Sequence, residues 1–189
     1  MSSQTAGAAV YLALGSNLSD RPAAMRGAVF ALDRHSGIHV DRAAGVASLY
    51  ESAPLTHPSD AKDQPPYLNS VVRVETTLEP AGLLAALQEI EASMGRVRRK
   101  RWEPRIIDID MLLYNELITH DRCLTLPHPR MHERRFVLEP LAEIAAEVIH
   151  PTLGATMASL ARELADSGRG GDLTRIAGPD WLDHAPAHR

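Results

Sequence analysis

Cysteine is almost absent from this chain of 189 residues, which contains Cys123 and no other. A single cysteine excludes an internal disulfide and a zinc site built from several thiolates. Long apolar runs are also missing, because the stretch from Ala8 to Leu14 is far shorter than the ~20 residues of a membrane helix. No basic residue precedes that stretch, as one would in a secretory signal. We therefore expect a soluble, cytoplasmic protein without a membrane partner.

The features of a nucleic-acid-binding protein are scarce as well. The formal net charge is −4, and the chain has only two Phe, two Trp and four Tyr residues. RNA-binding sheets need aromatic motifs on central strands, and DNA-binding domains need an excess of basic residues, so we expect no nucleic-acid partner. The sequence also lacks a G-x-x-x-x-G-K-[ST] loop and a G-x-G-x-x-G motif after a strand, which excludes a P-loop or kinase fold.

The size and composition are those of one compact domain. A chain of this length buries roughly 70% of its unfolded surface, and no repeat or low-complexity linker divides it. The composition changes only after about Pro151, where Gly, Ala and Asp become frequent. We expect a catalytic or binding domain over residues 1–151 and a C-terminal extension over residues 152–189, either packed on the domain or trailing from it. We also expect a monomer.

Hydrophobic periodicity predicts alternating strands and helices before that point. Strands are expected over Val10–Leu14, Ile38–Glu51, Tyr67–Thr76 and Ile106–Tyr114, with a short partner strand over Leu117–Thr119. Helices are expected over Pro22–His35 and Glu79–Met94, the second stopped by Gly95, and a proline-rich loop over Ser52–Pro66. This order of elements predicts an α+β fold with a ferredoxin-like antiparallel sheet and helices packed on it.

Positive charge is concentrated between Gly95 and Met111, where six of the ten residues from Arg96 to Arg105 are basic. One interpretation is a flexible, solvated loop. The other is a clamp for a polyphosphate, because guanidinium groups bind phosphate oxygens in pairs and Trp102 adds a flat face on which a ring could stack.

Two carboxylates follow this basic segment at once. Asp108 and Asp110 alternate with apolar residues, so in a strand both side chains leave the same face, with Cα atoms ~6.8 Å apart. An exposed sheet face could carry two aspartates without a function. Next to an arginine cluster, however, the pair indicates Mg²⁺ held against phosphate groups, since Mg²⁺ combines one or two carboxylates with substrate oxygens.

Two further segments carry weaker signals. Tyr67 and Asn69 place an aromatic ring and an amide on one face of a strand, which suits a polar heterocycle but also an ordinary packed strand. His128 lies between two prolines, with Arg134 nearby, and an isolated histidine of this kind is more often structural.

Seven motifs taken together resemble one enzyme family. They are YLALGSN from Tyr11 to Asn17, Pro54-Leu55, DQPPYLN from Asp63 to Asn69, GRVR from Gly95 to Arg98, RWEPR from Arg101 to Arg105, Asp108-Ile-Asp110, and LPHP from Leu126 to Pro129. In this order they resemble 6-hydroxymethyl-7,8-dihydropterin pyrophosphokinase over about Val10 to Pro151. The resemblance implies a ferredoxin-like core in three αβα layers and transfer of pyrophosphate from ATP, releasing AMP.

The resemblance also implies a role for each matching residue. Asp108 and Asp110 would be ligands of two Mg²⁺ ions, and Arg96 and Arg105 would be the cations nearest the transferred group. ATP would contact Gln88, Glu91, Arg98, Arg101, Trp102, Met111, Thr125, His128 and Arg134. The pterin would contact Ser52, Ala53, Pro54, Leu55, Tyr67, Asn69, Trp102 and Phe136.

Three local departures from the family pattern concern loops near the expected site. Glu103 stands where glycine is usual, Ala53 replaces a common proline, and the segment from Thr56 to Lys62 is longer than in the shortest members. One rival function is a ferredoxin-like domain that senses a nucleotide without reacting. Another is an RNA-binding domain that uses the basic loop, which the net charge and the eight aromatic residues disfavour. The paired aspartates favour transfer chemistry, because sensing does not need two metal ligands beside an arginine clamp.

Overall fold

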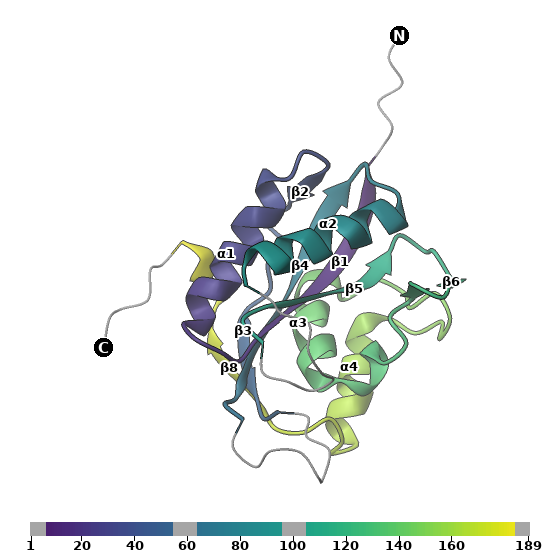
Figure 1. Cartoon of the computed structure of the whole chain (residues 1–189). Coiled ribbons are helices and arrows are strands. Elements are labelled where there is room, and N and C mark those ends of the chain that lie inside the picture. Colours follow the sequence, from purple (N-terminus) through teal and green to yellow (C-terminus); the bar gives the residue numbers. More distant parts are fainter. Residues whose placement is uncertain (1–6, 55–63, 96–104, 184–189) are drawn as a thin grey trace.

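A six-stranded antiparallel sheet forms the centre of the computed structural model, which describes residues 7–54, 64–95 and 105–183 (Figure 1). The strands are β1 (Ala8–Ser16), β2 (Ile38–Val40), β3 (Leu49–Ser52), β4 (Tyr67–Thr76), β5 (Asp108–Tyr114), β6 (Thr119–His120), β7 (Thr125–Leu126) and β8 (Leu173–Ala177). The helices are α1 (Arg21–Arg34), α2 (Pro80–Ser93), α3 (Arg135–Ala145) and α4 (Met157–Asp166), with short 3-10 turns η1 (Met131–Glu133) and η2 (Pro179–Leu182).

The strand order is β5-β1-β4-β3-β8, with β2 pairing on the same side of β4 as β3. Each of these pairs is antiparallel. Of the two long central strands, β1 pairs with β4 over its whole length, from Ala8–Thr76 to Ser16–Leu68. Such an order, with one helix between β1 and β2 and another between β4 and β5, is that of a ferredoxin-like fold. The predicted fold class is therefore confirmed.

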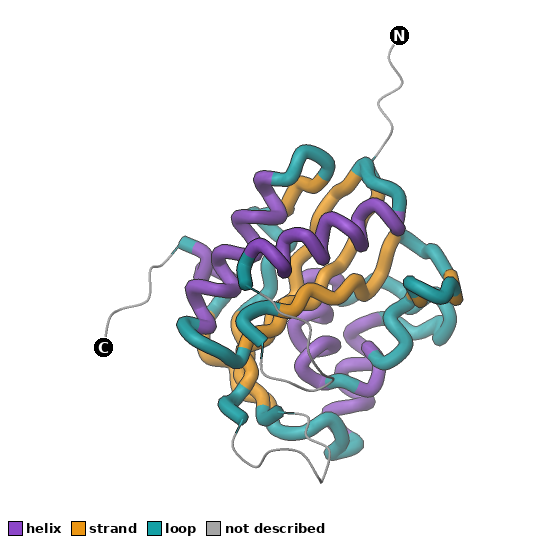
Figure 2. The backbone as a smooth tube through the Cα atoms, in the orientation of Figure 1, coloured by secondary structure: helices purple, strands orange, loops and turns teal. Residues whose placement is uncertain are grey.

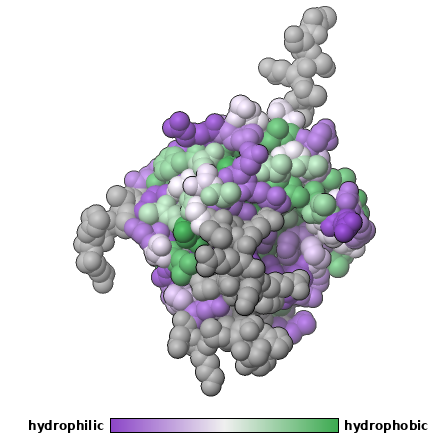
Figure 3. All heavy atoms as spheres, in the orientation of Figure 1, coloured by the Kyte–Doolittle hydropathy of each residue, from purple (hydrophilic) through white to green (hydrophobic). Residues whose placement is uncertain are grey.

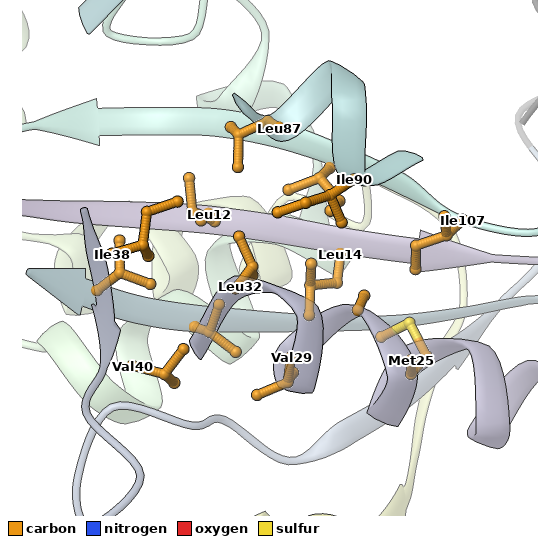
Figure 4. Close-up of a cluster of buried hydrophobic side chains, with 14 of the residues drawn as sticks. Leu12, Leu14, Met25, Val29, Leu32, Ile38, Val40, Leu87, Ile90 and Ile107 are labelled. Carbon is orange, nitrogen blue, oxygen red and sulfur yellow. The ribbon is translucent and has the colours of Figure 1, made fainter. Parts of the chain in front are cut away.

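Helices cover both faces of the sheet, which gives three layers (Figures 1 and 2). On one face, α1 and α2 bury their apolar sides against β1, as the side chains around Leu12 and Leu14 show in Figure 4. On the other face, α3 and α4 bury a second cluster that includes Leu112, Leu138 and Leu141. The alternation of side chains along β1 explains why one strand serves both clusters.

The helix boundaries follow local chemistry. Asp20 begins α1, because its carboxylate accepts a hydrogen bond from the Ala23 N–H at 2.9 Å. Gly95 follows the end of α2 with φ of +90°, a left-handed conformation that glycine adopts without strain. Both predicted helices are confirmed to within one residue at each end.

The segment from Ile38 to Glu51 is not one strand, as the sequence had suggested, but the two strands β2 and β3. Between them the chain turns at Asp41, whose carboxylate accepts the Ala44 N–H at 3.1 Å and pairs with Arg73 at 2.9 Å. Both strands pair with β4, at opposite ends of it. The hydrophobic pattern could not reveal the turn, because Val46 still packs against the same strand.

The predicted partner strand over Leu117–Thr119 is also wrong. The chain does turn at Asn115, with φ of +44°, but the short strand β6 pairs with β7 and not with β5. The outer edge of β5 is already engaged, since Ile109 N–H donates to the Glu91 carboxylate and Leu112 C=O accepts from the His128 N–H.

Large exposed apolar side chains are scattered over the surface. They are Phe30 in α1, Leu117 and Ile118 before β6, Ile149 and Leu153 between α3 and α4, and Ile176 in β8. Hydrophilic and hydrophobic residues are interspersed over the face drawn in Figure 3. Among the described residues, no helix combines the length and the apolar character that crossing a membrane requires.

Candidate active site

A pocket of about 350 Å³ opens where β1 ends and β4 and β5 begin. Ala13, Leu14 and Gly15 of β1 line it. Its walls come from the end of β3, the start of β4, the first half of β5, the segment 128–130 and the start of α3. Residues far apart in the sequence therefore meet at one end of the sheet.

The aspartates of β5 both line this pocket. Asp108 and Asp110 are half-buried on the pocket face, whereas Ile109 and Met111 are buried in the core beneath α2. Leu112 is an extra residue in β5, between the pairs Tyr11–Leu113 and Leu12–Met111. This bulge keeps the Leu112 side chain on the pocket face and turns its C=O outward to the His128 N–H at 2.9 Å.

Arg105 brings a positive charge to the same pocket and forms an ion pair with Asp108. Its backbone is fixed by Asn17, which is 1% exposed at the end of β1. The Arg105 N–H donates to Asn17 Oδ1 at 2.7 Å, and the Asn17 N–H donates to the Arg105 C=O at 3.0 Å. The Asn17 amide also donates at 3.5 Å to Gln64 Oε1 and to the Pro65 C=O. One buried amide thus joins the two chain segments that border the pocket.

A second cation, Arg134, lines the same pocket as the aspartates. Burial lowers the pKa of its guanidinium, and the charges of Asp110 and Asp108 oppose this shift. Its Nε atom is buried and has no hydrogen-bond partner among the described residues. A half-buried guanidinium that lines a pocket is suited to bind an anion.

His128 is a neutral hydrogen-bond donor in this site. Burial, followed by the charge of Arg134, lowers its pKa to about 4. The Arg130 N–H donates to His128 Nδ1 at 3.2 Å, which leaves the ring hydrogen on Nε2. At neutral pH the ring therefore offers an N–H group to a ligand without adding charge.

The other side of the pocket is less charged and partly aromatic. Asn69 is 5% exposed, and its NH₂ group donates to Ser52 Oγ at 3.0 Å. Its Oδ1 atom accepts no hydrogen bond from the described residues and remains an acceptor for a ligand. Burial raises the pKa of Tyr67, so its phenol stays neutral. Phe136 completes this side, with the Arg134 guanidinium 5.8 Å from its ring centroid.

The structure brings together most of the site residues expected from the sequence. Those that line the pocket are Ser52, Ala53, Tyr67, Asn69, Arg105, Asp108, Asp110, His128, Arg134 and Phe136. Arg96, Arg98, Arg101, Trp102 and Leu55 lie outside the described residues, so their expected roles stay predictions.

Five expected contacts do not line the described pocket: Pro54, Gln88, Glu91, Met111 and Thr125. Gln88 is exposed on α2, and Thr125 belongs to β7. Met111 is buried because it points from β5 to the opposite face from Asp110. The Glu91 carboxylate accepts the buried Ile109 N–H at 2.7 Å and so links α2 to β5 between the two aspartates.

Several pocket residues had not been expected as contacts: Gly15, Gln64, Leu112, Arg130 and Val137. Gly15 belongs to the motif YLALGSN and Gln64 to the motif DQPPYLN, so the sequence motifs could have indicated both residues. A Cβ atom on Gly15 would stand 3.8 Å from Asn69 Oδ1 and 4.0 Å from the Tyr67 ring. Leu112 reaches the pocket only because of the bulge, which periodicity does not predict.

The carboxylates are suited to Mg²⁺ that arrives with a nucleotide. The described residues contain no cluster of three or more His, Cys, Asp or Glu side chains able to hold a metal ion by themselves. Two aspartates on one strand face provide the part of the coordination that Mg²⁺ takes from proteins in phosphate-transfer sites, the remainder coming from phosphate oxygens and water. The donor set therefore fits Mg²⁺ bound with a polyphosphate.

Comparisons with known proteins agree with this geometry. The family model described as 7,8-dihydro-6-hydroxymethylpterin-pyrophosphokinase (HPPK) matches residues 11–146. The 2-amino-4-hydroxy-6-hydroxymethyldihydropteridine pyrophosphokinase of Bacillus subtilis is 44% identical over 138 residues, which cover 73% of this chain and 78% of the relative. The protein of the same name from Haemophilus influenzae is 42% identical over 157 residues, 82% of this chain and 92% of the relative.

A solved structure shares the fold at low identity. Wild-type HPPK-DHPS of Plasmodium falciparum superimposes with a TM-score of 0.68 at 14% identity, covering 92% of this chain and 49% of that longer one. Because the family model spans most of the chain and the bacterial relatives match it over most of their own length, this chain belongs to the 7,8-dihydro-6-hydroxymethylpterin-pyrophosphokinase family.

Proposed function

We propose that this protein transfers a pyrophosphoryl group from ATP to the hydroxymethyl group of 6-hydroxymethyl-7,8-dihydropterin, a step of folate biosynthesis. The observation that carries the proposal is one pocket with a charged half and an aromatic half. Asp108, Asp110, Arg105 and Arg134 line the first, and Tyr67, Asn69 and Phe136 line the second. A polyphosphate suits the first half, and a flat heterocycle with polar edges suits the second.

The reaction joins these two halves. The substrate hydroxyl oxygen bonds to the β-phosphorus of ATP, the bond from that phosphorus to the α-phosphate oxygen breaks, and AMP leaves while the hydroxyl proton passes to solvent. Negative charge develops on the phosphate oxygens, so positioning and electrostatic stabilisation are the main demands on the protein. The guanidinium groups of Arg105 and Arg134 meet that demand from the described part of the pocket.

The carboxylates hold the metal in this proposal. Asp108 and Asp110 would bind two Mg²⁺ ions together with the ATP phosphates, and the bound ions would neutralise phosphate charge. The neutral His128 ring can donate from Nε2 to the nucleotide. Arg96, Arg98, Arg101 and Trp102 are expected to complete the ATP side.

On the pterin side, the Asn69 carbonyl oxygen can accept a hydrogen bond from the heterocycle. The Ser52 hydroxyl holds the amide so that this oxygen stays available. Tyr67 and Phe136 supply aromatic surface for the bicyclic ring. We expect the protein to act as a cytoplasmic monomer.

The test is to mix the purified protein with ATP, Mg²⁺ and 6-hydroxymethyl-7,8-dihydropterin and to separate the nucleotide products. We expect AMP and pterin diphosphate in equal amounts, and no product when EDTA removes the metal. ADP in place of AMP would refute pyrophosphoryl transfer but keep a kinase. ATP binding without turnover would support the nucleotide sensor, which the family relationship does not favour.

A further inference from the structure

The C-terminal part of the chain enters the sheet although it lies beyond the region of the family match, which ends at residue 146. Strand β8 pairs with β3 from Leu49–Ala177 to Ser52–Leu173. β3 has only four residues, and it would be an edge strand without β8. Short edge strands open easily, so β8 should stabilise the conformation of β3.

Trp181 anchors this added strand. It follows β8 in the turn η2, is 4% exposed and belongs to the apolar cluster between the sheet and α1 and α2. Its indole N–H donates to the Ala47 C=O at 2.9 Å, in a buried position two residues before β3. The same carbonyl accepts a hydrogen bond from Ser70 Oγ at 2.9 Å. Trp181 is therefore attached to the chain segment that leads into β3.

A second link runs from β8 to the helix on the other face. Arg175 of β8 lies 3.8 Å from Glu143 Oε1 of α3. The Glu143 carboxylate also accepts the Ser48 N–H at 2.7 Å and the Tyr50 hydroxyl at 2.5 Å. β3 is thus held by β4, by β8 and by α3, whose first turn carries the pocket residue Phe136.

The pocket end of β3 makes this support relevant to function. Ser52, the last residue of β3, pairs with Leu173 of β8 and accepts the Asn69 amide through its hydroxyl. Ser52, Ala53 and Asn69 all line the pocket on its less charged side. The Asn69 amide also donates to the C=O groups of Tyr50 and Tyr67, both at 3.4 Å. A shift of β3 would remove the shorter bond to Ser52 and move the Tyr50 carbonyl, and so would change the hydrogen bonds that Asn69 offers to a heterocycle.

We propose that the segment 173–182 supports the pterin-binding half of the active site from outside the pocket, with Trp181 as a positioning residue that acts through Ala47 and β3 on Ser52 and Asn69. The inference rests on the proposed function for the identity of the ligand. It predicts a selective effect: loss of the Trp181 anchor weakens pterin binding and leaves nucleotide binding intact. The reason is that Asp108 and Asp110 lie on β5, and that neither Arg105 nor Arg134 belongs to β3 or β8.

The experiment compares Trp181→Ala with a matched core substitution, Leu32→Ala. Leu32 is fully buried in the same apolar cluster but lies near the far end of α1. Calorimetry would give the dissociation constant of a non-hydrolysable ATP analogue with Mg²⁺, and then that of 6-hydroxymethyl-7,8-dihydropterin in its presence. For Trp181→Ala we expect the pterin constant to rise roughly tenfold and the nucleotide constant to change by less than about twofold.

Trp181→Phe should restore pterin binding, since an aromatic ring refills the cluster and Ala47 keeps its bond from Ser70. Leu32→Ala should lower the melting temperature without a selective loss of pterin. The inference would be overturned if Trp181→Ala lost affinity for both ligands to the same extent. It would also be overturned if Leu32→Ala lost as much affinity for the pterin as Trp181→Ala. Trp181→Leu keeps an apolar side chain and replaces Trp181→Ala if that variant does not fold.

Hydrogen exchange separates this inference from the proposed function. In Trp181→Ala the amides of residues 49–52 should exchange faster than in the wild type, while those of β5 should not. This readout does not depend on any ligand. If the wild type failed to bind pterin, the proposed function would fall, whereas unchanged exchange in β3 would refute the positioning role of Trp181 by itself.

Discussion

Two carboxylates and three arginines line the pocket, and the carboxylates carry the proposed metal role. Asp110→Asn keeps the shape of the side chain but removes its charge, so a bound Mg²⁺ would lose one anionic ligand. We expect kcat to fall by on the order of 10²-fold or more, because phosphate transfer depends on this electrostatic stabilisation. The AMP-release assay measures the change, and circular dichroism shows whether the fold is intact.

The control for Asp110→Asn is Asp41→Asn. Asp41 is likewise next to a guanidinium, that of Arg73 at 2.9 Å, but it lies at the turn after β2 and outside the pocket. Asp41→Asn removes the charged partner of Arg73, so we expect a somewhat lower free energy of unfolding and a kcat near the wild-type value. An active Asp110→Asn protein would remove the metal role from this residue.

Asn17 makes a different prediction, which concerns the position of Arg105 and not its charge. Asn17→Ala leaves the Arg105 N–H without its acceptor and breaks the link to Gln64 and Pro65. We expect a loss of about 1–3 kcal/mol in the free energy of unfolding and a roughly tenfold lower kcat, since the guanidinium is no longer held beside Asp108. Urea unfolding and steady-state kinetics give the two quantities.

Thr76→Val is the matched control for Asn17→Ala. The Thr76 hydroxyl is buried at the opposite end of β4, donates to the Gly37 C=O at 2.6 Å and accepts from the Leu78 N–H at 3.1 Å. Its loss should lower stability by a similar amount and leave kcat unchanged. If the two variants reduced kcat equally, the Asn17 effect would be general destabilisation.

At the scale of elements, the contact of α2 with β5 determines where the aspartates lie. The Glu91 carboxylate accepts the Ile109 N–H between Asp108 and Asp110, in a fully buried position. Glu91→Leu leaves that N–H unsatisfied and should cost about 1–3 kcal/mol of stability. Glu91→Gln keeps an acceptor oxygen and should retain both the stability and the KM for ATP.

The two Glu91 variants also separate two roles for this residue. The family resemblance implies that Glu91 contacts ATP, whereas in the structure its carboxylate accepts the Ile109 N–H of β5. A raised KM for ATP in Glu91→Gln, with unchanged urea unfolding, would support the ATP contact. A loss of stability confined to Glu91→Leu would support the link between α2 and β5.

The elements that sequence patterns predicted well are those with one uninterrupted apolar face. β4 was predicted with its observed bounds, and α1 and α2 to within one residue. The failures lie where tertiary pairing interrupts a pattern. The chain between β2 and β3 leaves the sheet at Asp41, and β6 pairs with β7 because the edge of β5 is engaged by Glu91 and His128.

The candidate site could be predicted from the sequence where charge and spacing are local. The alternation of Asp108 and Asp110 was visible along one strand, and the two side chains do line one pocket. Leu112 was not predicted, because a bulge depends on the pairing of β5 with β1. The support of β3 by Trp181 was also hidden, since a contact across 134 positions of the chain leaves no local pattern.

At the scale of the whole molecule, an acidic chain contains a pocket with several arginines, and this affects how stability depends on pH. His128 lies in that pocket with a pKa of about 4, lowered from 6.5 by burial and by Arg134. In the unfolded chain the ring regains its ordinary pKa. Between about pH 6.5 and 4 the unfolded state therefore binds a proton that the folded state does not, so the free energy of unfolding falls as the pH falls.

His128→Asn tests this linkage, because the Asn Oδ1 atom can replace Nδ1 as the acceptor of the Arg130 N–H. Urea unfolding is measured at about pH 7 and about pH 4.5, without Mg²⁺ or nucleotide. On lowering the pH, the free energy of unfolding of the wild type should fall by about 1–3 kcal/mol more than that of the variant. His39→Asn, at a side chain that is 76% exposed, serves as the surface control. Equal pH dependence in the wild type and in His128→Asn would mean that the histidine is not held neutral, and the proposed neutral Nε2–H donor to ATP would then have to be abandoned.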